Sequence, residues 1–350
     1  MNPRTIAIDL AKEVFELAIA EDGVRIRARH RLSRTEFIAF MAQQPVGAVI
    51  MEACGTAHFW ARRFRDQGHR VRLLPAQYVR PYRRRNKTDR ADAEALIEAA
   101  RCAGIQPVPI KSVDQQQLQH LHRLREQWKA TRVARINGLR GILREQGVNL
   151  PTGAACALKR APEALEQEAI PAPLRLALRA VLDEIAVLEL RIRAVERQLL
   201  ELTRGDEAVH RLRQVPGIGL LTSTALVAAA GSPQHFKSGR HLAAWLGITP
   251  RESSSGNRRQ LGRITKRGDV YLRMLLIHGA RSVLARAKSV ARMAAPALSG
   301  LQRWALSLEQ RIGHNKATVA LANKLARIAW AVWRHARDFQ PNHARSPTLA

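Results

Sequence analysis

The chain has 350 residues, of which 46% are hydrophobic, and this length suggests two domains with cores of their own. Its 58 Lys and Arg residues outnumber 29 Asp and Glu residues, which gives a formal net charge of +29. Such an excess would destabilise a compact protein with no polyanion nearby, so nucleic acid is the expected partner. The three cysteines form no C-x-x-C pair, which argues against a zinc site or a disulfide framework and favours a reducing cytosol.

An anionic membrane is the weaker alternative partner. No Lys- and Arg-rich amphipathic segment flanks a hydrophobic anchor. The longest uncharged run, residues 214–236, is long enough to cross a bilayer, but proline, glycine and hydroxyl residues interrupt it. We therefore expect a buried helical hairpin there. The N-terminus leads directly into an expected strand and carries no signal peptide.

The first 110 residues alternate between strand and helix patterns. Ser33 and Glu36 form a capping-box pattern that predicts the start of a helix. Strands are predicted at 4–9, 13–20, 24–29, 47–51 and 70–74, and helices after Ser33 and at 56–67, 76–84 and 89–102. This order predicts a mixed sheet with helices on its faces.

The middle of the chain is dominated by two long helical patterns. Ser112 begins a helix that is predicted to run to about residue 146. Residues 151–173, rich in Ala and Pro, are predicted to be a connection. From 174 to 202 apolar residues recur at alternating steps of three and four, which indicates a coiled-coil seam. The seam has two interpretations, an intramolecular hairpin with the first helix or an oligomerisation surface.

After Gly205 the pattern is mainly helical. Val215-Pro216-Gly217-Ile218-Gly219 resembles a helix-hairpin-helix, in which Gly217 and Gly219 would open a helix N-terminus onto a DNA phosphate, although a plain helical turn would look similar. Other predicted segments are helices at 220–230, 239–246, 268–288, 296–312 and 316–337, a polar basic loop at 249–266 and a disordered tail at 338–350. The expected division is therefore 1–110, 111–205, 206–337 and 338–350.

Four acids stand where a cluster would form. Asp9 ends the first strand and Glu52 ends the strand at 47–51. Asp89 and Asp92 lie on one face of a helix. Ribonuclease-H-like nucleases bring acids together in this way, and two Mg²⁺ ions roughly 3.5–4 Å apart could then hold a scissile phosphate. Taken singly, each acid has a structural explanation, such as a favourable charge at a helix start.

Basic residues surround this helix and also fill the segment at 249–268. Near the helix, the residues predicted to hold nucleic acid are Arg83, Arg84, Arg85 and Lys87. The second basic group is Arg251, Arg258, Arg259, Arg263, Lys266 and Arg267. Within that segment three serines precede Gly256. Composition alone favours a flexible loop, and the alternative is a serine nucleophile whose phosphate the arginines neutralise.

Five passages together resemble the DEDD transposases of bacterial insertion sequences, namely the insertion-sequence 110 family and most closely its 1111 subgroup. The passages are Ala7-Ile8-Asp9-Leu10-Ala11-Lys12, Met51-Glu52-Ala53-Cys54-Gly55, Asn86-Lys87-Thr88-Asp89-Arg90-Ala91-Asp92-Ala93, Val215-Pro216-Gly217-Ile218-Gly219, and the Ser255-Gly256 loop through Lys266-Arg267-Gly268-Asp269. The similarity runs from about residue 5 to 335.

The resemblance implies an α/β RuvC-like N-terminal domain whose four acids are Asp9, Glu52, Asp89 and Asp92, a coiled-coil middle and a mainly α C-terminal transposase domain. The family's serine precedes a glycine, which places it at Ser255, with Ser253 and Ser254 as neighbouring candidates. The resemblance also implies Mg²⁺, DNA of the element ends and target, a structured guide RNA, a dimer or tetramer with shared catalytic centres, and a bacterial cytoplasmic protein associated with the nucleoid.

Two other functions remain open from the sequence. A RuvC-like junction nuclease would use metal-activated water and would not need Ser255. A non-catalytic nucleic-acid-binding scaffold would need neither the serine nor the acids. The favoured prediction is an RNA-guided transposase that cuts and rejoins DNA.

Overall fold

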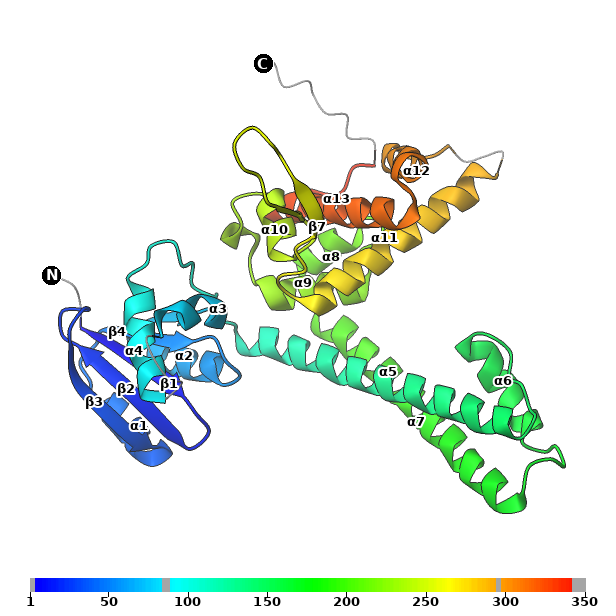
Figure 1. The fold of residues 1–350 in the computed structure, drawn as a ribbon, viewed down its shortest axis with the longest axis horizontal. Coiled ribbons are helices and arrows are strands. Elements are labelled where there is room, and N and C mark those ends of the chain that lie inside the picture. Colours follow the sequence, from blue (N-terminus) through cyan, green and yellow to red (C-terminus); the bar gives the residue numbers. More distant parts are fainter. Residues whose placement is uncertain (1–3, 84–88, 294–296, 342–350) are drawn as a thin grey trace. The chain divides into compact units, whose positions relative to one another are not determined.

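The computed structural model of the chain describes residues 4–83, 89–293 and 297–341, and for Asp89 the backbone alone. The chain divides into two compact units, Met1–Val113 and Asp114–Ala350 (Figure 1). The first unit is mixed α/β and the second is mainly helical, as the sequence predicts. The finer division into four segments stays a prediction.

The N-terminal unit contains a five-stranded sheet in the order β3-β2-β1-β4-β5. The strands are β1 (Thr5–Leu10), β2 (Val14–Ala20), β3 (Ile26–Ser33), β4 (Ala48–Glu52) and β5 (Arg70–Leu74). The first three pair antiparallel, whereas β1, β4 and β5 run parallel. The predicted mixed sheet is confirmed. The third strand begins two residues later than expected because Asp22 accepts hydrogen bonds from the backbone N–H groups of Val24 and Arg25, which lengthens the turn.

Helices cover both faces of this sheet. On one face lie α1 (Arg34–Ala42), which begins at the predicted Ser33 capping box, and α2 (Ala57–Asp66). Their aromatic side chains pack with Phe15 of β2, and the rings of Phe15 and Phe37 stack with centroids 4.2 Å apart. The other face carries small residues, including Ala7, Ala18 and Ala20, against which α4 (Asp89–Ala100) packs. Small side chains let this helix lie close to the strands. The short helical segments α3 (Ala76–Val79) and η1 (Arg80–Tyr82) precede it.

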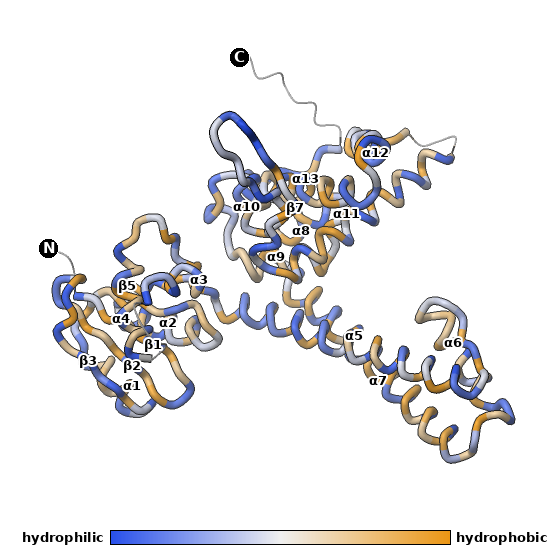
Figure 2. The backbone as a smooth tube through the Cα atoms, viewed as in Figure 1, coloured by the Kyte–Doolittle hydropathy of each residue, from blue (hydrophilic) through white to orange (hydrophobic). Residues whose placement is uncertain are grey.

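Two long helices pair within one chain at the start of the second unit. They are α5 (Val113–Glu145) and α7 (Ala172–Leu202). The ion pairs that join them are Arg125–Glu196, Arg132–Glu189 and Arg135–Glu184. Because one residue number rises as the other falls, the helices run antiparallel. Figure 2 shows hydrophobic and hydrophilic residues alternating along both. The intramolecular hairpin is thus confirmed, while oligomerisation stays a prediction.

The prediction that residues 151–173 form a plain connection is wrong, because this segment contains α6 (Ala154–Ala164). A stripe of alanines, Ala157, Ala161 and Ala164, is buried on the helix. Part of this stripe packs against Leu139 of α5 and Leu178 of α7. Pro162 lies inside the helix, and the gain from packing the alanine face outweighs its local disruption.

The rest of the second unit is a helical cluster with one core. Its elements are α8 (Glu207–Arg213), α9 (Leu220–Ala230), η2 (Pro233–His235), α10 (Gly239–Trp245), α11 (Val270–Ala291), α12 (Gly300–Ile312) and α13 (His314–Arg334). Most residues of α9 are buried, as expected for the uncharged run. In the described parts of the chain no helix combines the length and apolarity that a membrane crossing needs.

Two predictions for this region are wrong. The segment 249–266 is not a loop throughout but contains a β-hairpin, β6 (Pro250–Glu252) and β7 (Leu261–Ile264). Backbone hydrogen bonds hold the two strands together, and almost all of their residues are exposed. The sequence therefore lacks the alternation of apolar and polar residues that would indicate a strand. The tail does not begin at 338, because the backbone N–H of Phe339 donates to Gln214 and the Gln214 amide donates to Asp338. Residues 342–350 lie outside the described residues.

A buried polar group joins the hairpin of long helices to the helical cluster. His122 of α5 is 3% exposed, and its ring nitrogens lie 3.0 Å from the Tyr271 hydroxyl and 2.9 Å from the Thr224 hydroxyl. Burial lowers the pKa of His122 to about 4, and the positive charge of Arg125 adds to the shift. His122 is therefore neutral at pH 7.

We expect the second unit to lose stability as the pH falls from 6.5 to about 4. In this window the unfolded chain binds a proton at His122 and the folded chain does not, so acid favours unfolding. His122→Gln should flatten this part of the pH profile. Hydrogen exchange of peptides from α5 and α9, corrected for intrinsic rates, measures the effect.

His58 provides the matched control in the first unit. Burial, followed by the charges of Lys111 and Arg62, lowers its pKa to about 4 as well. His58→Gln should flatten the pH profile of α2 and leave that of α5 and α9 unchanged. An unchanged α5 profile in His122→Gln would contradict the assignment.

Candidate active site

Two of the four predicted acids stand side by side at one edge of the sheet. The parallel register of β1 and β4 pairs Thr5 with Ala48 and continues to Ile8 with Met51. One step further, the same register sets Asp9 opposite Glu52. Adjacent strands lie about 4.8 Å apart, so the backbones bring these two carboxylates together. Both residues are partly exposed.

Side-chain alternation decides which face they occupy. Ile8 and Met51 belong to the core covered by α1 and α2, whereas Ala7 and Ile50 belong to the core covered by α4. Because successive side chains of a strand point to opposite faces, Asp9 shares the face of Ala7. By the same rule Glu52 shares the face of Ile50. Both acids therefore stand on the face that α4 covers.

A third carboxylate, which the sequence reasoning missed, lies in the same row. The antiparallel register pairs Asp9 with Glu16 of β2, so their side chains share a face. Like charges directly opposite one another repel. Arg31 of β3 lies 3.6 Å from the Glu16 carboxylate and offsets part of this repulsion. Once the register of β1 and β2 is known, the two-residue alternation along β2 places the Glu16 side chain on the same face as Asp9.

Asp92 lies on the helix that covers this face of the sheet. It lies in the first turn of α4, and its carboxylate forms an ion pair with Arg83 in which both side chains are less than 20% exposed. Arg83 was predicted to hold nucleic acid, and in this structure its nearest charged partner is Asp92. The side chain of Asp89 and the predicted contacts Arg84, Arg85 and Lys87 lie outside the described residues.

The acids present the hard oxygen donors that a divalent cation prefers. Asp9 and Glu52 end neighbouring parallel strands, and Asp92 starts the helix on the same face. In the described residues no group of three or more His, Cys, Asp or Glu side chains converges closely enough to hold a metal ion. The Arg83 guanidinium meanwhile supplies the positive charge next to Asp92. The donor set fits a divalent cation, provided that Arg83 releases Asp92.

The predicted serine loop forms the tip of the β6–β7 hairpin. The backbones of Ser255 and Arg258 exchange hydrogen bonds of 3.2 and 3.1 Å, which closes a tight turn around Gly256. The Ser254 hydroxyl donates to Glu252 at 2.8 Å and accepts from the backbone N–H of Gln260. Within the described ranges the Ser255 hydroxyl makes no such bond, and Ser255 is exposed.

The base of the hairpin is clamped to the helical cluster. Gly247 has φ of 70°, and an added Cβ would overlap the backbone of Arg267. The buried Arg273 guanidinium donates at 3.2 Å to the carbonyl oxygens of both Leu246 and Arg267. Lys266 also has positive φ. This close approach of two backbone segments holds the base of the hairpin against the helices. No motif in the sequence marks the part that Arg273 plays.

The basic residues of this segment point to solvent. Arg251, Arg258, Arg259, Arg263, Lys266 and Arg267 are all exposed. The Arg259 side chain lies 3.4 Å from the Glu252 carboxylate, where both are largely exposed and the pair is weak. A long exposed hairpin with this many cations attracts polyanions.

The Val215–Gly219 turn has two parts with different surroundings. Gly217, with φ of 80°, packs directly on the backbone of Gly279 in α11, and any side chain at either position would collide there. Gly219 is exposed and begins α9 without a side-chain cap. Among the described residues no side chain caps the first backbone N–H groups of α9, and an uncapped helix start of this kind suits a phosphate.

Comparison with known proteins defines the class. A family model for DEDD transposases of the IS110 type matches residues 6–147. A second model, described as the transposase IS116/IS110/IS902 family, matches residues 209–295. The first match spans the acids and the second spans the serine hairpin, so both parts of the chain match models of transposases.

Relatives along the whole chain identify the family. A probable family 20 transposase of Pseudomonas aeruginosa is 42% identical over 97% of this chain and 100% of its own length. The transposase for insertion sequence element IS1111A of Coxiella burnetii is 36% identical over 94% of this chain and 89% of its own. The transposase for insertion sequence element IS1328 of Yersinia enterocolitica is 35% identical over 95% of this chain and 97% of its own length. The chain belongs to the IS116/IS110/IS902 family of transposases.

Gly247→Ala should loosen the serine hairpin. A left-handed conformation costs a non-glycine residue about 1–2 kcal/mol, and the overlap with Arg267 adds to this cost. We expect a lower free energy of unfolding by urea and faster proteolysis between residues 250 and 264.

Gly262→Ala is the matched control, because an added Cβ there would make an ordinary 3.9 Å contact with Arg251. It should behave like the unchanged protein. Equal effects of the two substitutions would show that the clamp at Gly247 does not hold the hairpin.

Proposed function

We propose that this transposase cuts and rejoins DNA with a serine nucleophile and metal-bound carboxylates, guided by a structured RNA. The N-terminal unit is then RuvC-like, with the acids at the carboxyl edge of its parallel strands. The observation that carries the proposal is the pairing register that sets Asp9 opposite Glu52 on the face covered by the Asp92 helix. DEDD transposase domains use divalent metal.

Asp9, Glu52, Asp89 and Asp92 would hold the metal, and Mg²⁺ suits their oxygen donors. When bound, the metal would neutralise charge on a phosphate and polarise it for attack. The protein's own part is to bring carboxylates from two strands and one helix to a common edge. Arg83 balances Asp92 until the metal takes its place.

The serine hairpin would supply the nucleophile. The Ser255 Oγ attacks the DNA phosphorus, an Oγ–P bond forms and one backbone P–O bond breaks. The hydroxyl loses its proton, and the departing DNA oxygen takes one up. Ser255 is favoured over Ser254 because the Ser254 hydroxyl is bound to Glu252 and Gln260 within the turn. The exposed arginines around it would offset the developing negative charge.

The acids and the serine belong to different compact units of the chain. The resemblance to the 110 family favours a centre in which the acidic unit of one subunit completes the serine site of another. The exposed side of the α5–α7 hairpin carries apolar residues, including Val133, Leu176 and Leu190, which suit a coiled-coil contact in a dimer or tetramer.

The proposal of an RNA guide rests on the same resemblance and on the net charge of the chain. A net charge of +29 attracts polyanions in general, RNA as well as DNA. A folded RNA that stays bound to the protein would balance it. Co-purification of the protein with its nucleic acid, followed by sequencing, tests this part directly.

Ser255→Ala should abolish the covalent protein–DNA adduct. The adduct is trapped by denaturation during reaction with a DNA fragment that carries the element end, and is counted by gel mobility after nuclease digestion. We expect a loss of at least about a thousandfold, because no other group can form the Oγ–P bond. Ser253→Ala is the control and should retain the adduct.

The same assay separates the alternative functions. DNA cleavage without any adduct, and unaffected by Ser255→Ala, would indicate a nuclease that uses metal-activated water. Activity that survives Asp9→Asn would indicate a scaffold without catalysis. Persistence of the adduct in Ser255→Ala with loss in Ser254→Ala would move the nucleophile by one residue.

Arg83→Gln should tighten metal binding. The guanidinium and a divalent cation compete for Asp92, so removing the competitor should raise the affinity for Mn²⁺ several-fold. Isothermal titration or the electron paramagnetic resonance signal of free Mn²⁺ measures this without any reaction. Arg90→Gln, which removes an equal charge from a residue paired with Glu94, is the control. An equal gain in both variants would show general repulsion instead of competition.

A further inference from the structure

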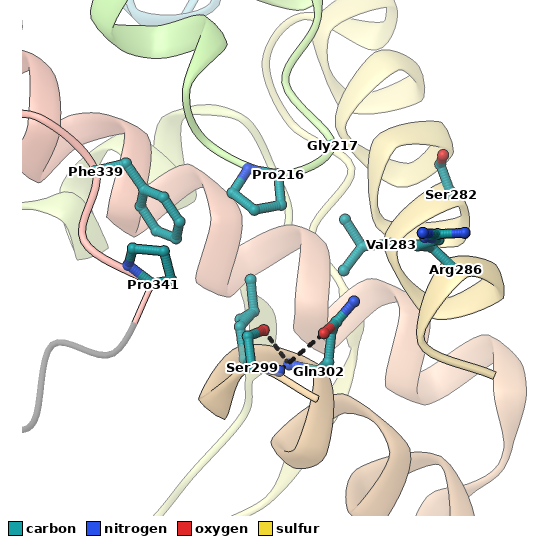
Figure 3. Close-up of a pocket in the computed structure, with 10 residues that line it drawn as sticks. Pro216, Gly217, Ser282, Val283, Arg286, Ser299, Gln302, Phe339 and Pro341 are labelled. Atoms are coloured by element: carbon teal, nitrogen blue, oxygen red, sulfur yellow. Dashed lines mark hydrogen bonds between the residues drawn. The ribbon is translucent and has the colours of Figure 1, made fainter. Parts of the chain in front are cut away.

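A pocket of about 400 Å³ lies in the second unit, away from the serine hairpin in sequence. It is bordered by the Pro216-Gly217 turn, by α11, by the start of α12 and by the segment that follows α13. Figure 3 shows Phe339 and Pro341 on one side, with Val283 and Arg286 of α11 on the other. Its volume falls in the range of small-molecule sites, roughly 300–1,000 Å³.

The lining combines flat apolar groups with one free cation. Phe339 and the two prolines offer ring faces, and Val283 is buried at the wall. The Arg286 guanidinium is exposed and, in the described part of the chain, has no ion-pair partner. At another wall the side-chain oxygens of Ser299 and Gln302 each accept from the other residue's backbone N–H in a capping box. The cation is therefore the group left to bind a charged ligand.

The aromatic wall of the pocket is held in place. Phe339 follows the end of α13, and its backbone N–H donates to the Gln214 side chain at 3.0 Å. The Gln214 amide in turn donates to Asp338 at 3.0 Å. Gln214 directly precedes the Val215–Gly219 turn, which forms the border between Phe339 and α11 (Figure 3). Residues that lie 124 and 125 positions apart in the chain are thus tied together beside one opening.

We propose that this pocket binds the base of an unpaired nucleotide, with Arg286 on the adjoining phosphate. An aromatic ring beside a cation matches a base and its phosphate. A simple anion would leave the ring faces unused, and an apolar ligand would leave the cation unused. A base within a duplex is stacked between its neighbours and presents no free face, so the ligand is an unpaired strand of DNA or RNA.

The neighbouring helix extends the same binding path. Pro216 and Gly217 line the pocket, and two residues later Gly219 precedes α9, whose first backbone N–H groups have no side-chain cap in the described part of the chain. A strand with its base in the pocket can place a further phosphate at this helix start. The inference requires only that the protein binds nucleic acid, and it is independent of the Ser255 chemistry.

Photo-crosslinking with short oligonucleotides that contain 5-iodouracil tests the pocket in the full-length protein. At elevated salt, which suppresses non-specific contacts, we expect a single-stranded probe to crosslink to the peptide that carries Phe339, and the matching duplex not to do so. DNA and RNA probes of one sequence identify which strand is preferred. Crosslinks that never include this peptide, with either probe, would overturn the proposal.

Variants provide the quantitative test. Phe339→Ala should weaken single-strand binding about five-fold or more, as loss of one stacked base does, while Phe339→Tyr keeps the ring and the affinity. Arg286→Ala should weaken single-strand binding more than Arg281→Ala, which removes an equal charge from α11 outside the pocket. Equal losses in the two arginine variants, or unchanged binding in Phe339→Ala, would contradict the proposal. Because binding is measured without cleavage, failure of the serine mechanism would leave these results unchanged.

Discussion

Parallel pairing between β1 and β4 is the constraint on which the N-terminal unit depends. It brings two strands 43 positions apart in the chain into one register, and the register brings Asp9 opposite Glu52. The same row extends to Glu16 through the antiparallel pairing of β1 with β2. Three carboxylates on neighbouring strands repel one another. The sheet tolerates them because all three are partly exposed and because Arg31 pairs with Glu16.

The alternation of side chains along the strands explains why Asp9 and Glu52 stand on the face that α4 covers. Alanines on β1 and β2 leave room for α4, and this helix carries Asp92 in its first turn. The Arg83–Asp92 pair neutralises the helix carboxylate, which is less than 20% exposed. Removal of one partner from a buried ion pair would leave an uncompensated charge. This ion pair links the architecture of the unit to its proposed metal dependence.

In the second unit, close backbone contacts hold the exposed elements in place, whereas strand register positions the acids of the first unit. Gly247 and Arg273 hold the base of the serine hairpin, and Gly217 and Gly279 let a turn rest on α11. Both arrangements leave a functional element on the outside of a rigid helical cluster. The hairpin tip then presents Ser255 among exposed arginines, and the turn borders a pocket that suits an unpaired base. The two features lie on one scaffold and can be tested separately.

Sequence patterns determined the five strands, the long helices, the Ser33 capping box and the class of protein, because periodicity and motif order are local properties of the chain. They also marked the acids, the serines and the arginines as candidates. Patterns could not show α6 or the β6–β7 hairpin, since the first is stabilised by packing between two distant helices and the second by backbone pairing. Only the tertiary structure decided that Glu16 stands beside Asp9, that Arg83 meets Asp92 and that Phe339 faces α11 across a pocket, because each of these depends on strand register or on contacts between residues far apart in the chain.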